Sequence, residues 1–260
     1  MTTSPGSPPL LEARNVTKRF GGLVAVKGFN MQVAPGALYG LIGPNGSGKT
    51  TVFNLLTGVY DLTEGEIYFD GKRIDGKRPY EITRRGVART FQNIRLFSEM
   101  TVLENVMTAR HLRSRQTLAD ALCGTTRHHD DERATRERAM ELLGIFDLAR
   151  VSDHDAASLP YGRQRRLEIA RALATEPRLL LLDEPAAGMN PQEAIDLMRL
   201  IARIREEFGL TILLVEHNMK VVMGISDTVH VIDHGETVAV GTPREVQTHP
   251  RVIEAYLGVG

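Results

Sequence analysis

Cysteine is almost absent from this 260-residue sequence, which contains Cys123 alone. A single cysteine excludes an internal disulfide and fits a reducing compartment. An excess of either charge is also missing, since 32 basic residues balance 32 acidic ones, and nothing indicates the strongly basic surface of nucleic-acid-binding domains. No apolar run approaches the ~18 residues that a membrane-spanning helix needs. We therefore expect a soluble, cytoplasmic chain that reaches any membrane only through partner proteins.

The N-terminal part of the chain predicts a tail followed by β-structure. Residues Met1–Pro9 are rich in Ser, Thr and Pro and lack the apolar segment of a secretory signal, so we expect a short disordered tail. Short alternating stretches at Leu10–Thr17 and Leu23–Val33 predict antiparallel strands. Gly65–Lys72 predicts a further hairpin strand, with Asp70-Gly71 as its turn.

The remaining chain alternates strands with helices. Ala37–Ile42 is a short apolar run that enters a glycine-rich loop, and Thr50–Thr57 has helical spacing up to Gly58. This alternation is typical of an α/β fold with a mainly parallel sheet covered on both faces. The later elements that we expect are strands at Arg178–Leu182, Thr211–Val215 and Thr228–Asp233, and helices at Gln164–Thr175, Pro191–Phe208 and Asn218–Ile225.

Residues 93–159 have a different character, with helical patterns and heavy charge. They predict a helical subdomain inserted into one domain over residues 10–260, whose core would comprise residues 10–92 and 160–260.

Within this insertion, Thr125–Arg138 has almost no apolar residues and predicts a solvated loop that leads into a helix at Ala134–Leu143. Its His128-His129-Asp130-Asp131 run superficially suggests a metal site, but we favour the interpretation as a charged loop.

The strongest functional pattern is Gly43-Pro-Asn-Gly-Ser-Gly-Lys-Thr50, a Walker A phosphate loop between a strand and a helix. Its glycines let backbone N–H groups converge on a phosphate chain, and the following helix adds its N-terminal dipole. Lys49 supplies a positive charge to the β- and γ-phosphates, and the Thr50 hydroxyl is suited to Mg²⁺. The residues predicted to bind ATP in this segment are Gly43, Pro44, Asn45, Gly46, Ser47, Gly48, Lys49, Thr50 and Thr51.

A second pattern, Leu179–Leu182 followed by Asp183 and Glu184, predicts a strand buried on both faces that ends in two acids. Ligands of open α/β sheets bind at the carboxyl ends of the strands. Asp183 is therefore placed to hold Mg²⁺, and Glu184 to polarise a water for attack on the γ-phosphate.

Upstream of that strand, Leu159-Pro160-Tyr161-Gly162-Arg163-Gln164 resembles the signature motif of ABC-type ATPases, usually written LSGGQ. The family's other elements match in order: Phe20 as the aromatic that stacks on adenine, Gln92 as the Q-loop, Pro185–Asn190 as the D-loop and His217 as the switch histidine. The resemblance covers residues 10–257. It implies the ABC ATPase fold, a P-loop NTPase sheet with an antiparallel β subdomain and an inserted helical subdomain.

The resemblance also implies roles and partners. The catalytic residues would be Lys49, Gln92, Glu184 and His217. The Mg²⁺ ligands would be Thr50, Gln92 and Asp183. In this family the signature helix of one subunit closes the phosphate loop of another, so two ATP molecules would lie in a head-to-tail dimer. Loss of the γ-phosphate would open the dimer, and Gln92 with the helical subdomain would pass this motion to a partner.

Several stretches resemble one subgroup, the LivG-type ATP-binding subunits of bacterial branched-chain amino-acid importers. These stretches are Arg89–Phe97, Met100–Val106, Asp183–Glu193, Val215–Met219 and Pro250–Gly258. The resemblance implies an ATPase held at the cytoplasmic face of the plasma membrane by two permeases, which a solute-binding protein supplies. Its ATPase partner would be a LivF-like subunit or a second copy of the chain.

Other ATPases share nearly all of these motifs. The alternatives are import of urea or another amide or amino acid, lipopolysaccharide export, and a non-transport ABC ATPase. A small-molecule kinase could use the phosphate loop but would need neither the signature nor His217.

Apolar residues around Gln92 suggest where a permease would dock. The five residues are Ile94, Leu96, Phe97, Met100 and Val102. Either all of them are buried in the helical subdomain, or Phe97 and Met100 line a groove for a short permease helix.

Two positions depart from the family pattern: Pro160 replaces the usual signature serine and Asn190 replaces the usual D-loop aspartate. Pro160 offers neither a hydroxyl nor a backbone N–H to a γ-phosphate on the opposite subunit. We expect the ATP site that this signature completes to be the less active one. Pro160→Ser should then raise ATP hydrolysis by the assembled complex, and an unchanged rate would count against this hypothesis.

Overall fold

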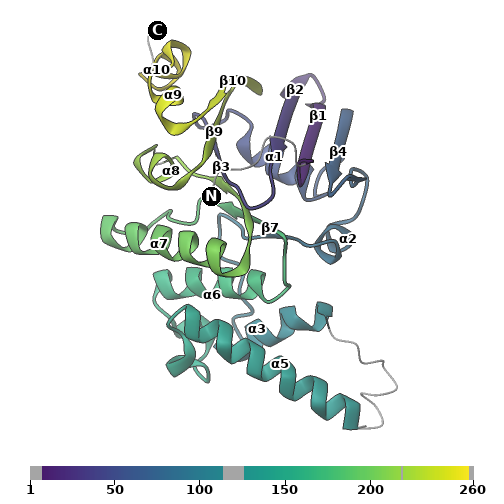
Figure 1. Cartoon of the computed structure of the whole chain (residues 1–260), viewed down its shortest axis with the longest axis vertical. Helices are drawn as coiled ribbons and strands as arrows, with labels where there is room; N and C mark the ends of the chain where they lie inside the picture. The colour runs from purple at the N-terminus through teal and green to yellow at the C-terminus, as the bar shows by residue number, and fades with distance from the viewer. Residues whose placement is uncertain (1–7, 114–125, 218, 258–260) are drawn as a thin grey trace. The chain divides into compact units, whose positions relative to one another are not determined.

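The computed structural model describes residues 8–113, 126–217 and 219–257 and divides the chain into two compact units, which are described separately (Figure 1). One unit combines Met1–Arg89 with Arg178–Gly260, and the other is Thr90–Pro177. Most of the predicted tail, Met1–Pro9, and Cys123 lie outside the described residues.

The first unit begins with a four-stranded antiparallel sheet of order β2-β1-β4-β5. Its strands are β1 (Leu11–Phe20), β2 (Leu23–Val33), β4 (Glu64–Phe69) and β5 (Lys72–Arg73). Asp70 and Gly71 join β4 to β5 with φ angles of 52° and 70°. Two successive residues with positive φ are the mark of a type I′ hairpin turn, so the predicted hairpin and its turn are confirmed.

The second sheet has six strands in the order β10-β9-β3-β8-β7-β6, all parallel except β10. They are β3 (Leu38–Ile42), β6 (Val87–Arg89), β7 (Leu179–Asp183), β8 (Thr211–Val215), β9 (Thr228–Asp233) and β10 (Glu236–Gly241). Every residue of β3, β7 and β8 is buried. In register, Val215 pairs with both Leu41 and Asp183, so β3, β8 and β7 end at one edge.

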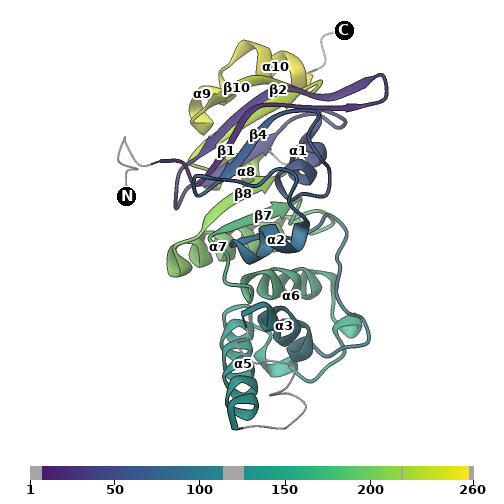
Figure 2. The same ribbon diagram turned by 90° about the vertical axis from the view of Figure 1, so that its right-hand side faces the viewer.

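Helices cover both faces of this sheet. In the first unit they are α1 (Lys49–Leu56), α2 (Pro79–Arg84), α7 (Pro191–Phe208), α8 (Met219–Ile225), α9 (Pro243–Gln247) and α10 (Pro250–Leu257). Alternate residues of the central strands, such as Leu179 and Leu181, share one hydrophobic core with α1 and the antiparallel sheet. Figure 2 shows α1 beside the antiparallel strands β1, β2 and β4. On the opposite face α8 packs so closely on β3 that a Cβ at Gly40 would lie 2.6 Å from Val222.

The second unit is helical, with α3 (Val102–Arg110), α5 (Thr126–Ile145) and α6 (Tyr161–Leu173). Short 3₁₀ turns occupy His111–Arg113, Ala149–Val151 and Ala156–Ser158. α6 packs against α3 and α5. For that reason this unit extends to Pro177, whereas the sequence predicted a subdomain that ends at residue 159.

The prediction of a loop before Ala134 is wrong, because α5 already begins at Thr126. Arg and Glu are strong helix formers, so a charged segment with few apolar residues still favours a helix. An i,i+3 ion pair between Asp130 and Arg133 supports its first part. Later in α5, Ala139 and Leu142 are buried and fix the helix on its neighbours.

A buried histidine connects three strands of the first unit. His230 on β9 is fully buried, and its ring nitrogens lie 3.1 Å from the Tyr39 hydroxyl on β3 and 2.8 Å from the Thr237 hydroxyl on β10. Its ring also stacks on Phe29. Burial lowers the pKa of His230 from 6.5 to about 4.

This lowered pKa predicts a loss of stability in mild acid. Between pH 6.5 and about 4 the unfolded chain binds a proton on His230 that the folded chain does not, so stability is lost as the pH falls. From pH 7 to pH 5 the free energy of unfolding should fall by about 2 kcal/mol through this residue alone.

Urea unfolding at both pH values should show this loss reduced in His230→Gln. The control is His234→Gln, because the His234 side chain is 94% exposed and should leave the pH dependence unchanged. Equal pH dependence in wild type and His230→Gln would contradict the assignment.

Candidate nucleotide-binding site

The phosphate loop follows β3 and is packed so tightly that side chains are excluded at two of its glycines. A Cβ at Gly43 would lie 2.0 Å from the Ile232 carbonyl oxygen, and one at Gly48 would lie 2.7 Å from that of Ala25. Gly48 also has φ of 106°, a conformation that glycine adopts without strain. The packing of the loop therefore requires glycine at positions 43 and 48.

Lys49 opens α1 directly after this loop, and its side chain curls back over it. The Lys49 Nζ donates to the carbonyl oxygens of Gly43, at 2.7 Å, and Pro44, at 2.8 Å. Burial lowers the pKa of Lys49, and the nearby carboxylates of Glu184 and Asp183 oppose this change. An ammonium held in this way is ready to exchange carbonyl partners for phosphate oxygens.

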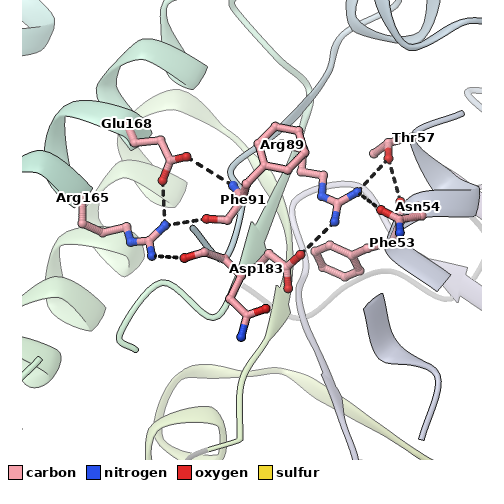
Figure 3. Close-up of polar contacts among 9 residues, drawn as sticks. Phe53, Asn54, Thr57, Arg89, Phe91, Arg165, Glu168 and Asp183 are labelled. Carbon is pink, nitrogen blue, oxygen red and sulfur yellow. Dashed lines mark hydrogen bonds and ion pairs between the residues drawn. The ribbon is translucent and has the colours of Figure 1, made fainter. Parts of the chain in front are cut away.

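Asp183, at the end of β7, is joined to α1 through Arg89 (Figure 3). The Arg89 Nη2 lies 2.8 Å from the Asp183 Oδ2, and its Nη1 donates to the Asn54 Oδ1 at 2.7 Å and the Thr57 Oγ1 at 3.1 Å. The guanidinium also lies over the Phe53 ring, 5.4 Å from its centre. Both charged side chains are nearly inaccessible, at 7% and 4% exposure. The role of Arg89 was not predicted from the sequence. The one feature that could have indicated it is the position of Arg89 at the end of the short strand β6.

Glu184 and His217 follow two neighbouring strands at the same edge. The His217 Nδ1 lies 3.7 Å from the Glu184 Oε2, and His217 remains 58% exposed. Glu184 has φ of 46°, a left-handed conformation that costs a residue with a side chain about 1–2 kcal/mol. The structure thus brings Lys49, Asp183, Glu184 and His217 together at the carboxyl edge of the sheet.

The donor groups at this edge fit Mg²⁺ bound together with phosphates. Mg²⁺ is usually held by one or two carboxylates plus phosphate oxygens and water. Thr50 is exposed on the first turn of α1 and offers a hydroxyl, while Asp183 offers a carboxylate. Among the described residues, no group of three or more His, Cys, Asp or Glu side chains could hold a metal ion alone.

Phe20, the predicted adenine contact, lies at the end of β1 and is 41% exposed. Its ring meets that of Tyr60 edge to face, with the ring centres 5.3 Å apart. The Lys18 Nζ lies 5.0 Å from the centre of the Phe20 ring and 5.8 Å from that of Tyr60. Two aromatic rings and a cation form an exposed surface suited to a purine base, and Tyr60 was not predicted.

Tyr256, on α10, is a further residue that sequence reasoning missed. Its hydroxyl is buried beside Gly43 without a hydrogen bond of good geometry. Burial raises the pKa of Tyr256 to about 12, and the backbone N–H of Gly43 opposes part of that rise. The C-terminal helix therefore contributes to the wall of the phosphate loop.

Gln92 and the signature belong to the second unit and are joined there by a buried ion pair. Arg165, fully buried on α6, donates to the carbonyl oxygens of Phe91 and Gln92 at 2.6 Å each and to Glu168 at 2.7 Å (Figure 3). Glu168 in turn accepts from the backbone N–H groups of Phe91 and Arg95. The backbone around Gln92 is thus bonded to the signature helix, while the Gln92 side chain is exposed.

The signature residues Leu159, Pro160, Tyr161, Gly162, Arg163 and Gln164 lead into this helix. Pro160 is the residue before the first turn, and no side-chain hydrogen bond caps the helix there. By contrast, Asn190 caps α7 by accepting from the Glu193 N–H at 2.9 Å, which gives the D-loop substitution a structural role. Whether Pro160 weakens one ATP site stays a prediction.

Of the five apolar residues near Gln92, only Val102 is fully buried. Phe97 is 47% exposed, and the guanidinium of Arg171 lies over its ring at 5.3 Å. Ile94, Leu96 and Met100 are half-buried. The interpretation that all five are core residues is therefore wrong, and Phe97 is available to a partner.

Removing one partner of the buried Arg89–Asp183 pair should cost far more stability than removing one partner of an exposed pair. Arg89→Ala leaves a buried carboxylate without its partner and should lower the free energy of unfolding by about 3–5 kcal/mol. The control is Arg178→Ala, whose pair with Asp70 is about half exposed, and it should cost less than about 1 kcal/mol. Urea unfolding of both variants measures the difference, and losses of equal size would contradict this account.

Known proteins share this sequence and fold. Residues 26–187 match the family described as ABC transporter, and residues 236–260 match the family described as branched-chain amino acid ATP-binding cassette transporter. The chain is 49% identical over 97% of its length to the high-affinity branched-chain amino acid transport ATP-binding protein BraF of Pseudomonas aeruginosa, covering 99% of that protein. The chain is 46% identical to the high-affinity branched-chain amino acid transport ATP-binding protein LivG of Escherichia coli K12. This match covers 97% of the chain and 99% of LivG.

A solved structure agrees with these matches. The ADP conformation of an ATP-binding cassette of an ABC transporter is 32% identical, with a TM-score of 0.83 over 97% of this chain and all of the other. In the described part of this chain, no helix is long and apolar enough to cross a membrane. The chain therefore belongs to the ATP-binding subunits of the ABC transporter family, in the branched-chain amino acid group that includes LivG and BraF.

Proposed function

We propose that this chain binds and hydrolyses MgATP to power the import of branched-chain amino acids. The observation that carries the proposal is the meeting of Lys49, Asp183, Glu184 and His217 at the carboxyl edge of one parallel sheet. Lys49 and the loop N–H groups bind the β- and γ-phosphates, and Thr50 and Asp183 would hold Mg²⁺. Mg²⁺ held there would offset the negative charge of the phosphates.

In the hydrolysis step, the Glu184 carboxylate orients a water molecule toward the γ-phosphate and accepts a proton from that water as it attacks. His217, whose Nδ1 lies 3.7 Å from the Glu184 Oε2, donates a hydrogen bond to the γ-phosphate. This hydrogen bond is lost when the γ-phosphate leaves, so His217 senses whether ATP is bound. Phe20, aided by Tyr60, stacks on the adenine. The products are ADP and phosphate, and loss of the γ-phosphate removes the group that connects the two subunits.

Two subunits complete the site. The signature of a second ATPase, a LivF-like subunit or another copy of this chain, closes the phosphate loop, and this chain's signature closes the other site. Two permeases hold the pair at the cytoplasmic face of the membrane, with exposed Phe97 contributing to that contact. The match over residues 236–260 favours branched-chain amino acids over the urea and lipopolysaccharide alternatives.

Uptake of labelled leucine by a strain that lacks this gene tests the proposal. The wild-type gene should restore uptake, and Glu184→Gln should not, although its protein still binds ATP. Full uptake with Glu184→Gln would contradict the catalytic role of Glu184. Restored uptake of urea but not of leucine would contradict the proposed substrate.

A second experiment tests the contact with the permeases. The Phe97→Ala variant should no longer co-purify with the permeases, while the isolated variant chain still binds ATP.

A further inference from the structure

The turn that follows β7 holds Glu184 in an unfavourable backbone conformation, and its own hydrogen bonds account for part of the restraint. The Glu184 N–H donates to the Val215 carbonyl oxygen at 2.9 Å. Within the turn, the Ala187 N–H donates to the Glu184 carbonyl oxygen at 3.1 Å. Glu184 has φ of 46°, so these contacts must outweigh a local preference for other conformations.

A side chain from another strand supplies a further restraint. The Ala186 N–H donates to the Glu216 Oε1 at 2.8 Å. Glu216 directly follows β8, and its side chain is only 1% exposed. A hydrogen bond from an N–H to a carboxylate is about twice as strong as one between neutral groups. The bond therefore joins the turn at the end of β7 to the rigid end of β8.

The buried position of Glu216 is unfavourable for a carboxylate, and the Ala186 N–H is one of the groups that offset this. Burial raises the pKa of Glu216, the Ala186 N–H and His217 lower it, and Glu184 raises it further. The His217 Nδ1 is 4.0 Å from the Glu216 Oε2, and His217 is itself more than half exposed. A buried acid beside another acid needs a compensating interaction, and the Ala186 N–H provides one.

We propose that Glu216 is a positioning residue for Glu184: its carboxylate oxygen holds the Ala186 N–H and thereby fixes the left-handed turn that directs Glu184 toward His217. Glu216 itself takes no proton from the attacking water and touches no nucleotide. This inference rests on the proposed role of Glu184 in ATP hydrolysis.

Three variants of the full-length chain, assembled with its transporter partners, separate geometry from charge. Glu216→Gln keeps an oxygen acceptor at the same distance and should stay within about threefold of the wild-type kcat. Glu216→Asp keeps the charge but shortens the side chain, and Glu216→Ala removes it. Both should lower kcat by up to about a hundredfold with little change in the KM for ATP, because binding is intact and the reacting group is misplaced.

Hydrogen exchange gives a readout that does not depend on turnover. The Ala186 amide should exchange slowly in wild type and Glu216→Gln and faster in Glu216→Asp. The comparison of Glu216→Gln with Glu216→Asp remains valid even if Glu216→Ala does not fold. A thermal unfolding curve of Glu216→Ala shows whether that variant folds.

The proposal is overturned where Glu216→Asp is active and Glu216→Gln is inactive, since the charge would then be required. Wild-type kcat in all three variants would overturn it as well. A failure of the proposed function looks different: the wild-type complex would not hydrolyse ATP, or Glu184→Gln would hydrolyse it at the wild-type rate.

Discussion

The ion pair between Arg89 and Asp183 is the contact on which the arrangement of the candidate nucleotide-binding edge depends. It joins the ends of β6 and β7 to α1, the helix that begins with Lys49. The two charges are almost completely withdrawn from water, so each is stabilised chiefly by the other and by neighbouring polar groups. The carboxylate that is proposed to hold Mg²⁺ is thereby fixed relative to the helix that carries Lys49, the lysine proposed to bind phosphate.

Around this pair, the fold brings functional groups from distant parts of the chain to one line. Parallel strands β3, β8 and β7 end in register, so the residues that follow each of them become neighbours. The loop after β3 provides backbone N–H groups, β7 ends in Asp183 and is followed by Glu184, and β8 leads to His217. In the helical unit, too, a buried arginine connects segments that are distant in the sequence. Arg165 donates hydrogen bonds from the signature helix to the backbone around Gln92.

Much of this could be predicted from the sequence, because motifs with fixed spacing carry strong backbone requirements. Few backbone conformations are compatible with three of these motifs: the glycines at 43 and 48, the buried leucines of β7 and the Asp70-Gly71 turn. The strands and helices around them lie where the sequence predicted. Segments without such requirements were harder to predict. The sequence predicted a loop in the charged first half of α5, because that segment has almost no apolar residues, and its helix depends on the helix propensity of Arg and Glu instead.

The residues that sequence reasoning missed all act through contacts between distant segments. Tyr60 meets Phe20, Tyr256 reaches Gly43 from the last helix, and Arg89 has partners on α1 and β7. Nothing in the spacing of such residues indicates a partner that only folding brings near. Glu216 is a similar case, because its neighbour His217 carries the recognisable motif while Glu216 faces inward to Ala186.

The central claim is that this edge binds ATP through the phosphate loop and Lys49. Calorimetric titration of the purified chain with ATP and Mg²⁺ tests it most directly, with Lys49→Ala as the variant and Lys27→Ala as the control. Lys27 forms an exposed ion pair with Glu236 and should not affect binding. The account predicts binding by wild type and Lys27→Ala, and affinity lower by about tenfold or more in Lys49→Ala, since a charged hydrogen-bond donor is lost. Equal affinity in all three proteins would contradict it.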